Sequence, residues 1–346
     1  MNPPPASAPP GSSAPSSTSG ARPRLTTSAM IASIAAPGQR TTSAPFGHAL
    51  VELARQRPEI VGMTADLGKY TDLHVFAQAF PERYYQMGMA EQLLMAAASG
   101  MAREGFVPFA TTYAVFAARR TYDFICLAIA EERLPVKIVC ALPGLTTGYG
   151  PSHQATDDIA IFRGMPRLTI VDPCDAVDIE QAVPAIAEYS GPVYMRLLRG
   201  EVPRVLDEYD YRFELGRAKL LCDGADVLAI CSGLLTARML DAAKRLRNDN
   251  VGVAVLHTPT IKPLDVQTIV REASQPGRLV VVAENHSIIG GLGEAVASAL
   301  LRAQVTPPFQ QIGLPDEFLD AGALPTLHQR YGISVEAIIG RIKAWL

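Results

Sequence analysis

From residue 45 to the carboxyl terminus, short runs rich in β-branched and aromatic residues alternate with longer runs in which apolar residues recur at helical spacing. This alternation is typical of parallel sheets covered by helices, because each parallel strand is reached through a helical crossover. It constrains the fold more than any other feature of the sequence. We therefore predict an α/β protein.

The first series of alternating segments predicts a complete α/β domain that ends near Gly200. We expect its strands at residues 59–64, 84–89, 107–112, 136–142, 168–173 and 192–198. Between them lie the helical patterns FGHALVELARQ, AEQLLMAAASGMAREG, YAVFAARRTYDFICLAIAEE and DAVDIEQAVPAIAEY. Ligands of open parallel sheets gather at the carboxyl ends of the strands, so the loops that follow strands are where a site is expected.

A polar connector, EVPRVLDEYDYRFELGRAK, leads to a second and smaller α/β series. We expect strands at residues 226–233, 251–257, 278–284 and 309–314, and helices at residues 235–248, 265–275, 291–303 and 334–345. The predicted domains are residues 44–205 and 206–346. Residues 1–43 are rich in Pro, Ser and Ala and predict a disordered tail, because such a composition buries too little apolar surface to offset chain entropy.

Composition excludes several classes of protein. The 346 residues are 48% hydrophobic and 19% charged with a net charge of -3, as in ordinary soluble proteins. No Lys/Arg-rich run can neutralise nucleic-acid phosphates, and no apolar stretch is long enough to span a membrane. The five cysteines lack metal-ligand spacing, so we expect reduced thiols in a cytoplasmic protein and no metal held by this chain.

Glu91 is the first candidate site residue, because it follows a predicted strand and opens an apolar helix. A carboxylate is favoured in the first turn of any helix, which is the ordinary explanation for it. In a partly dehydrated setting, however, such a group prefers its neutral form unless a partner compensates, and it can share a proton with a ring nitrogen of a bound heterocycle. That setting is expected from the apolar residues that bracket it: Met87, Met89, Leu93, Leu94 and Met95.

Further candidates follow at later strand ends. Tyr113 and Phe116 stand three residues apart at a helix start, where aromatic residues are usually core but can also sandwich a flat ring. His153, in the glycine-rich loop LPGLTTGYGPSHQATDD, is either a proton shuttle or sugar-hydroxyl contact, or a surface histidine without a role. In YMRLLRGEVP, Arg196 and Arg199 suit either a phosphate or an interdomain ion pair, and we favour phosphate for Arg199.

These stretches, in this order and each at a strand end, resemble the carboxyl-terminal part of transketolases, particularly the split kind encoded as two chains. The resemblance runs from about residue 45 to the end of the chain. It rests on GMAEQLLMAAASGMA, PFATTYAVFAARRTYD, YGPSHQATDDIAIFRGMP, VYMRLLRG, TPTIKPLD and AENHSIIGGLGEAV. It implies a thiamine-diphosphate-binding domain of the pyrimidine type, followed by a smaller transketolase C-terminal domain that mainly supports assembly.

The resemblance also implies roles for the candidate residues in transferring a two-carbon ketol unit from a ketose phosphate to an aldose phosphate. Glu91 matches the catalytic glutamate that bonds the pyrimidine ring nitrogen of thiamine diphosphate and promotes its imino tautomer. Tyr113 and Phe116 match the aromatic residues around the pyrimidine. His153 matches a histidine at the substrate channel, and Arg199 matches an arginine that receives the sugar phosphate. The cofactor supplies the hard chemistry and the protein manages protons.

The sequence contains no Gly-Asp-Gly followed by the downstream Asn that together hold the metal and diphosphate in this family. The resemblance therefore implies a second polypeptide, a diphosphate-binding N-terminal subunit that also holds Mg²⁺. Because the cofactor lies between domains of different subunits in such enzymes, we expect an assembly of two copies of each chain.

The glycine-rich loop departs from the family pattern. Many split transketolases resemble THAGITVGEDGATHQ in this loop, whereas this chain reads CALPGLTTGYGPSHQ. The usual early histidine is replaced by Leu142 or Ala141, depending on the gap, and the acidic pair is reduced to Tyr149. Loss of a hydrogen-bonding residue redirects recognition of a sugar hydroxyl. We therefore expect a specialised sugar, branched or deoxy, such as apulose 4-phosphate.

Two other functions remain open. The beta subunit of a 2-oxoacid or acetoin dehydrogenase shares the two-domain plan and also uses a glutamate, although GMAEQ followed by TYAVFAARRTYD is closer to transketolase. A non-catalytic partner subunit that has kept the fold is the second. An activity like that of 1-deoxyxylulose-phosphate synthase fits less well, because that enzyme carries all its domains on one chain.

Overall fold

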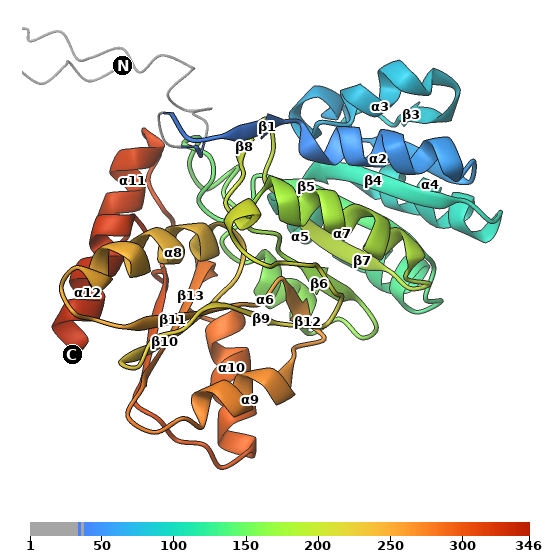
Figure 1. The fold of residues 1–346 in the computed structure, drawn as a ribbon. Helices are drawn as coiled ribbons and strands as arrows, with labels where there is room; N and C mark the ends of the chain where they lie inside the picture. The colour runs from blue at the N-terminus through green and yellow to red at the C-terminus, as the bar shows by residue number, and fades with distance from the viewer. Residues whose placement is uncertain (1–33, 36–37) are drawn as a thin grey trace, which may run out of the picture.

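The computed structural model describes residues 34–35 and 38–346, so most of the predicted tail lies outside the described residues. The described residues form two α/β units, each built on one mainly parallel sheet (Figure 1). The predicted fold class, two parallel-sheet-containing α/β domains, is confirmed. Every helix in this part of the chain is too short or too polar to cross a lipid bilayer.

The first sheet has seven strands in the order β12-β6-β7-β5-β4-β2-β3. All neighbours in it are parallel except the pair β12 and β6. Its central strands are buried along their whole length, and this is why they read as continuous apolar runs. The strands are β2 (Ile60–Thr64), β3 (Tyr84–Gln86), β4 (Val107–Tyr113), β5 (Lys137–Ala141), β6 (Thr169–Val171), β7 (Val193–Leu197) and β12 (Thr260–Lys262).

Helices cover both faces of the first sheet, as right-handed crossovers between its parallel strands require. Strand order reverses direction after β6, so α7 lies with α2 and α3 on one face, opposite α4, α5, η3 and α6 (Figure 1). The helices are α2 (Pro45–Gln56), η1 (Gly68–Thr71), α3 (His74–Ala79), η2 (Pro81–Arg83), α4 (Glu91–Arg103), α5 (Ala114–Arg120), the π-type η3 (Phe124–Ala130), α6 (Asp158–Arg163) and α7 (Ala176–Glu188).

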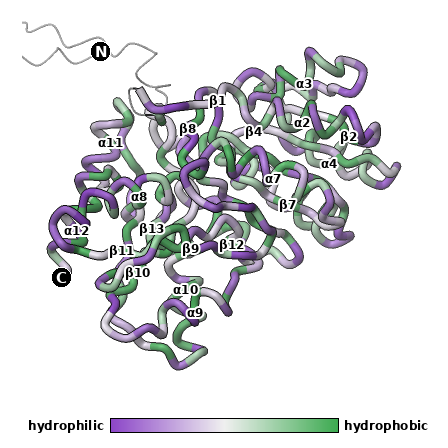
Figure 2. The backbone as a smooth tube through the Cα atoms, viewed as in Figure 1, coloured by the Kyte–Doolittle hydropathy of each residue, from purple (hydrophilic) through white to green (hydrophobic). Residues whose placement is uncertain are grey.

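The second sheet has five strands in the order β14-β13-β10-β11-β9, parallel except for β9. Helices α8 and α12 pack together, as do α9 and α10, and α8 carries both hydrophobic and hydrophilic residues along its length in Figure 2. The elements are β9 (Lys219–Cys222), β10 (Val227–Cys231), α8 (Gly233–Arg247), β11 (Val253–His257), α9 (Val266–Ala273), β13 (Leu279–Ser287), α10 (Leu292–Arg302), β14 (Phe309–Leu314), α11 (Leu324–Arg330) and α12 (Val335–Trp345).

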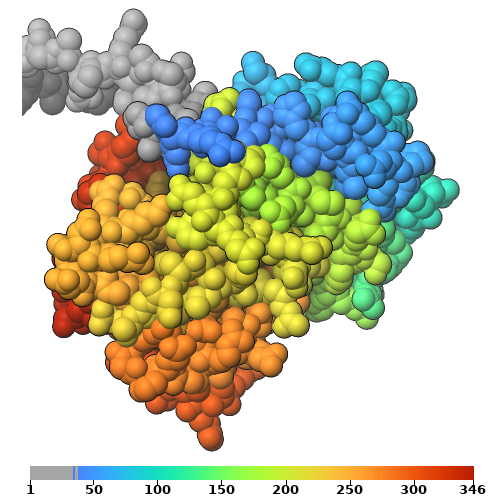
Figure 3. Space-filling model, viewed as in Figure 1, coloured from blue at the N-terminus to red at the C-terminus, as the bar shows by residue number. Residues whose placement is uncertain are grey.

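Three features are not predicted by the alternating pattern, and two of them join the two units. Strand β12 belongs to the second series in the sequence, yet it pairs with β6 of the first sheet. Strand β1 (Thr41–Ser43), which lies within the range predicted as a tail, pairs with β8 (Glu201–Pro203). The connector, with 3-10 helix η4 (Leu206–Glu208), lies across the junction, and the two units are in close contact on the face shown in Figure 3.

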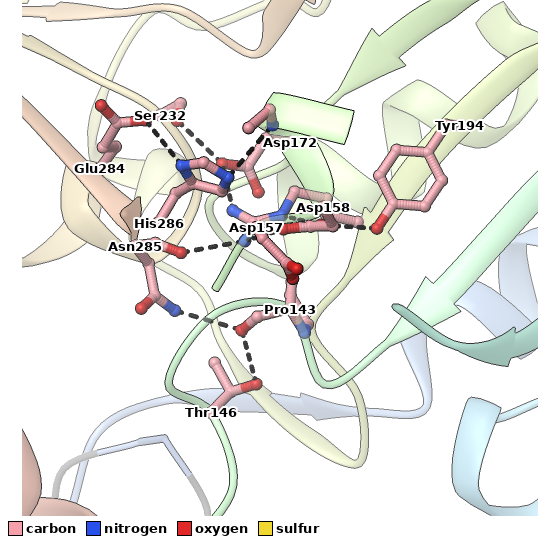
Figure 4. Close-up of polar contacts among 12 residues, drawn as sticks. Pro143, Thr146, Asp157, Asp158, Asp172, Tyr194, Ser232, Glu284, Asn285 and His286 are labelled. Atoms are coloured by element: carbon pink, nitrogen blue, oxygen red, sulfur yellow. Dashed lines mark hydrogen bonds and ion pairs between the residues drawn. The ribbon is translucent and has the colours of Figure 1, made fainter. Parts of the chain in front are cut away.

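A buried ion cluster fastens the two units together (Figure 4). Arg196, near the end of β7, donates from Nε to Asp158 at 2.8 Å and from Nη1 to Asp172 at 3.2 Å. Its Nη2 donates to the backbone oxygen of Asn285 in β13 at 2.9 Å. Ser232, after β10, donates to Asp172 at 2.8 Å. Of the two arginines in YMRLLRGEVP, Arg196 therefore lies at the domain junction, with its ion pairs inside the first unit and its hydrogen bond to Asn285 crossing to the second.

Removing the buried cation should destabilise the chain far more than removing an exposed one with the same number of partners. Arg196→Met leaves two buried carboxylates without compensation, and we expect a loss of about 3–5 kcal/mol in the free energy of unfolding. Arg245 also pairs with two carboxylates, Asp241 at 2.9 Å and Glu336 at 3.0 Å, but its side chain is half exposed. Arg245→Met should cost about 1 kcal/mol or less. Urea unfolding of both variants checks this, and equal losses would contradict it.

Candidate active site

Glu91 is the first residue of α4 and is 4% exposed. Its Oε1 accepts a hydrogen bond from Nη1 of Arg120 at 2.8 Å. Arg120 is the last residue of α5, and its side chain is half exposed. The compensating partner that a dehydrated carboxylate requires is therefore present, and it lies on a side chain with room to move.

The expected apolar surroundings of Glu91 are only partly present. Leu94 and Met95 are fully buried on the inner face of α4, but Met89 is 84% exposed and Leu93 is 54% exposed. Met89 precedes α4 and Leu93 lies on the exposed side of the helix, so neither contributes to the burial of Glu91. Further exposed apolar groups follow α5, in and before η3, and α4 contacts both α5 and η3. We call the exposed groups of these elements the apolar face: Met89, Leu93, Tyr122, Phe124 and Leu127.

The aromatic candidates and the histidine come together in one cluster. Tyr113 ends β4 and Phe116 lies in the first turn of α5, with ring centroids 5.5 Å apart. The His153 ring lies 5.9 Å from Tyr113 and 5.5 Å from Phe116, edge-on to both. The Arg120 guanidinium stacks 3.8 Å above the Phe116 ring and so links this cluster to Glu91.

His153 is set within the glycine-rich loop and not on a free surface. Its Nδ1 shares a 2.9 Å hydrogen bond with the hydroxyl of Ser152, and Tyr149 packs 5.4 Å from its ring. Burial, reinforced by the charge of Arg120, lowers the pKa of His153. The imidazole is therefore neutral at neutral pH and offers both a hydrogen-bond donor and an acceptor.

Arg199 follows β7, and its guanidinium lies 5.8 Å from the ring of Tyr70. Among the described residues, its buried Nε has no hydrogen-bond acceptor. Burial raises the pKa of Tyr113, and the charge of Arg199 opposes that shift, so the arginine acts on the same cluster. A buried donor without an acceptor is costly, so this nitrogen is suited to bind an anion.

Asp72 supports the backbone beside Arg199. Both of its carboxylate oxygens accept from the backbone N–H of Gly200, at 3.1 and 3.2 Å. Burial raises the pKa of Asp72 to about 6, with that hydrogen bond and the charge of Arg199 opposing the shift. The carboxylate thereby fixes the turn that ends the strand.

The structure thus places all five predicted site residues beyond the carboxyl ends of the strands of the first sheet. They are Glu91, Tyr113, Phe116, His153 and Arg199. Sequence reasoning missed Arg120, Tyr70 and Asp72. For Arg120 a signal was present, because it stands four residues after Phe116 and therefore on the same helix face. Tyr70 and Asp72 come from a 3-10 turn and its cap, where no periodicity exists to place a side chain.

One group of metal-ligating residue types lies elsewhere in the described residues. Ligand atoms of Cys174, Asp178 and His257, all buried, lie within 4.8 Å of one another. Nε2 of His257 already pairs with Asp178 at 2.9 Å, and its Nδ1 pairs with Thr236 at 2.8 Å. Asp178 and His257 therefore bond each other across the domain junction.

Two protein families match the chain in succession. The family described as transketolase, pyrimidine binding domain, matches residues 38–204. The family described as transketolase, C-terminal domain, matches residues 216–338. Together they cover nearly all of the part of the chain that carries the two sheets.

Curated relatives agree with these matches. A transketolase family protein of Sinorhizobium fredii is 70% identical over 94% of this chain and 94% of its own length. A 6-deoxy-6-sulfo-D-fructose transketolase subunit of Clostridium sp. is 36% identical over 84% of this chain and 89% of its own. An apulose-4-phosphate transketolase subunit of Phocaeicola vulgatus is 35% identical over 85% of this chain and 93% of its own.

A solved structure shows the same fold. It is described as a split gene transketolase, inactive beta4 tetramer, and it matches with a TM-score of 0.79 and 39% sequence identity over 88% of this chain and 97% of that one. The resemblance seen in the sequence is confirmed. The chain belongs to the transketolase family and corresponds to the subunit of a split transketolase that carries the pyrimidine-binding and C-terminal domains.

Proposed function

We propose that this chain is one subunit of a thiamine-diphosphate-dependent transketolase, which transfers a two-carbon ketol unit from a ketose phosphate to an aldose phosphate. The observation that carries the proposal is the connected series Glu91, Arg120, Phe116, His153 and Tyr113 at a single sheet edge. It combines a buried carboxylate, aromatic walls and a neutral histidine, the chemistry needed to hold a heterocycle and manage protons.

The residues present fit the aminopyrimidine of the cofactor. The rings of Tyr113 and Phe116 are inclined at 42°, so they form two walls of a corner instead of the parallel sandwich that their spacing predicts. Glu91 lies within reach of this corner through Arg120. When bound, thiamine diphosphate supplies the carbon nucleophile that cleaves a bond beside a carbonyl group.

Glu91 is proposed to hold a proton against the pyrimidine ring nitrogen, and Arg120 controls when it can do so. In the structure the Glu91 carboxylate is engaged by Arg120 through the 2.8 Å ion pair. Arg120 is half exposed, so its side chain can move aside without a large cost in burial. Release of the pair leaves the Glu91 carboxyl free to donate or share a proton with the ring nitrogen.

The substrate end of the site is proposed to consist of His153, Tyr149 and Arg199. His153 contacts sugar hydroxyl groups as a neutral donor and acceptor, and Arg199 receives the terminal anion. The names of two relatives specify a sulfonated sugar and a sugar phosphate, both of which end in an anion. The loop lacks the family's early histidine and its acidic pair is reduced to Tyr149, which supports a specialised sugar such as apulose 4-phosphate.

We propose that a diphosphate-binding subunit completes the site, holding the cofactor's diphosphate and Mg²⁺, in an assembly of two copies of each chain. The apolar face adjoins Glu91 and exposes several large side chains in one area, as surfaces that bind another protein do. The solved relative made of four beta chains is described as inactive, which agrees with a need for a second kind of chain. The five free cysteines agree with a reducing, cytoplasmic setting.

A beta subunit of a 2-oxoacid or acetoin dehydrogenase and a non-catalytic subunit are the alternatives. Pyruvate and acetoin carry no distal phosphate, so the buried, unpartnered Nε of Arg199 favours a sugar phosphate. Assays of the reconstituted complex with ketose phosphates and with pyruvate plus lipoamide separate the first alternative. Calorimetric titration with thiamine diphosphate and Mg²⁺ separates the second, for which no binding is expected.

Glu91→Gln should abolish most of the activity of the reconstituted complex. The amide keeps the shape of the side chain but cannot carry the acidic proton, so we expect kcat to fall about 100-fold or more, in the range typical of a lost general acid–base group. Circular dichroism and gel filtration should be unchanged. Glu104→Gln, an exposed position at the other end of α4, is the matched control and should keep full activity. Near-normal turnover by Glu91→Gln would refute the role.

Arg199→Met should weaken binding of the phosphorylated sugar. Loss of a charge-assisted hydrogen bond of about 1.5–3 kcal/mol should raise KM about 10- to 150-fold. The KM of the same sugar without its phosphate should change little. Arg302→Met, at the exposed end of α10, serves as control. An equal effect on both sugars would show that Arg199 does not read the phosphate.

Leu127→Glu should impair association with the partner subunit. The side chain is 56% exposed, so the isolated chain should tolerate the charge, but burying it in an interface is costly. Leu301→Glu is the matched control, because Leu301 is 70% exposed and lies on α10. Sedimentation velocity of each variant mixed with the partner measures association. Assembly by both variants to the same extent would place the interface elsewhere.

A further inference from the structure

We propose that His328 and Asn285, in the second unit, are positioning residues that fix the glycine-rich loop and thereby the substrate end of the site. The loop carries Tyr149 and His153 but belongs to the first unit. The catalytic consequence of the inference rests on the proposed function. That these two residues hold the loop rests only on contacts between the two units.

Asn285 grips the start of the loop with its side chain (Figure 4). Its Oδ1 accepts from the backbone N–H of Leu145 at 2.9 Å, and its Nδ2 donates to the backbone oxygen of Pro143 at 3.3 Å. The side-chain amide thus adds to the backbone bridge that Gly144 makes with Ala155 of the same loop, where Gly144 N–H donates to the Ala155 oxygen at 2.9 Å. Asn285 is 2% exposed and is held in turn by Arg196, which donates to its backbone oxygen.

Gly144 permits this close approach. Its φ is +56°, in the left-handed region that favours glycine. A Cβ added there would lie 2.0 Å from the backbone oxygen of Asn285, well inside contact distance. The loop can therefore lie against β13 only with glycine at this position.

His328, in α11, holds the other side of the same loop residue. Its Nε2 bonds the backbone oxygen of Leu145 at 2.7 Å. Nη2 of Arg238 donates to Nδ1 of His328 at 2.7 Å, and because a guanidinium can only donate, Nδ1 must carry the lone pair and Nε2 the proton. Burial lowers the pKa of His328 to about 3, so the ring keeps this form at neutral pH. Both backbone groups of Leu145 are therefore bound by the second unit.

The second unit also contacts the loop directly before Tyr149 and directly after His153, the two residues proposed to face the substrate. The backbone N–H of Gly322 donates to the oxygen of Gly148, directly before Tyr149, at 2.9 Å. Nε2 of Gln154, directly after His153, donates to the oxygens of Thr147 at 3.2 Å and Asp320 at 3.1 Å. The smaller domain thus does more than support assembly, the main role that the resemblance implied for it.

Weakening the hydrogen bonds from His328 and Asn285 to the loop should impair one part of the site and spare the other. Tyr149 and His153 depend on the loop, whereas Glu91, Tyr113 and Phe116 are placed by α4, β4 and α5 of the first unit. Small displacements of positioning groups have large effects on rate and substrate binding. Loss of the grip should therefore impair sugar binding and leave cofactor binding intact.

The test compares three variants in the complex reconstituted with the partner subunit. His328→Leu removes the donor to Leu145, whereas His328→Gln restores an amide N–H at the reach of the imidazole Nε2. Ile338→Ala, in the fully buried core of α12, is the control for general destabilisation. We expect His328→Leu to raise KM for the sugar phosphate at least 10-fold and to leave the Kd of thiamine diphosphate within twofold. His328→Gln should recover most of the loss, and Ile338→Ala should leave KM unchanged.

Hydrogen exchange of residues 143–150 in the full chain alone gives a readout that needs no activity. His328→Leu should speed exchange in this segment at least 10-fold, and Ile338→Ala should not. Unchanged exchange in His328→Leu, or equal effects of Ile338→Ala on exchange or KM, would overturn the inference, as would failure of His328→Gln to restore KM. If the wild-type complex transfers no ketol unit, the proposed function fails, while the exchange measurement still decides whether the grip exists.

Discussion

The buried guanidinium of Arg196 is the interaction on which the arrangement of the two units depends. It joins two carboxylates of the first unit to a backbone oxygen of the second, with every partner taken out of water. An ion cluster of this kind is costly to desolvate and does not by itself imply high stability. The cluster instead fixes the relative positions of its members, because a buried charge is stable only where a partner compensates it. The end of β7, which leads into Arg199, is thereby fixed relative to β13.

The candidate site has a cofactor half and a substrate half, and the two units hold them in different ways. The cofactor half is built within the first unit, where α4 presents Glu91 and the end of β4 presents Tyr113. The substrate half lies on a loop that Asn285 and His328 hold from the other unit. Rigid elements place the groups that bind a flat ring, and cross-domain hydrogen bonds place the groups that contact a sugar. The exposed apolar side chains near Glu91 leave room for a further chain to close the site.

Much of this could be predicted from the sequence, and the reasons are local. Buried parallel strands read as apolar runs, and helices with one buried face read as a periodic pattern, so ten predicted strands and four helices of the second series appear near their expected positions. Helix α11 and the edge strand β9 were not predicted. Helix α11 is short and has a proline in its first turn, and β9 is a short edge strand, so neither shows a clear periodic pattern. The candidate residues were found because each stands where a strand ends.

The sequence by itself determined the two α/β units, their order and the residue types at the strand ends, since these depend on spacing along the chain. The tertiary structure alone decided which groups meet. It paired Glu91 with Arg120, turned Met89 and Leu93 outward, and carried β12 into the first sheet. It also assigned Arg196 to the domain junction and left Nε of Arg199 without an acceptor among the described residues. Contacts between residues far apart in the chain depend on the packing of whole elements, which leaves no periodic signal in sequence.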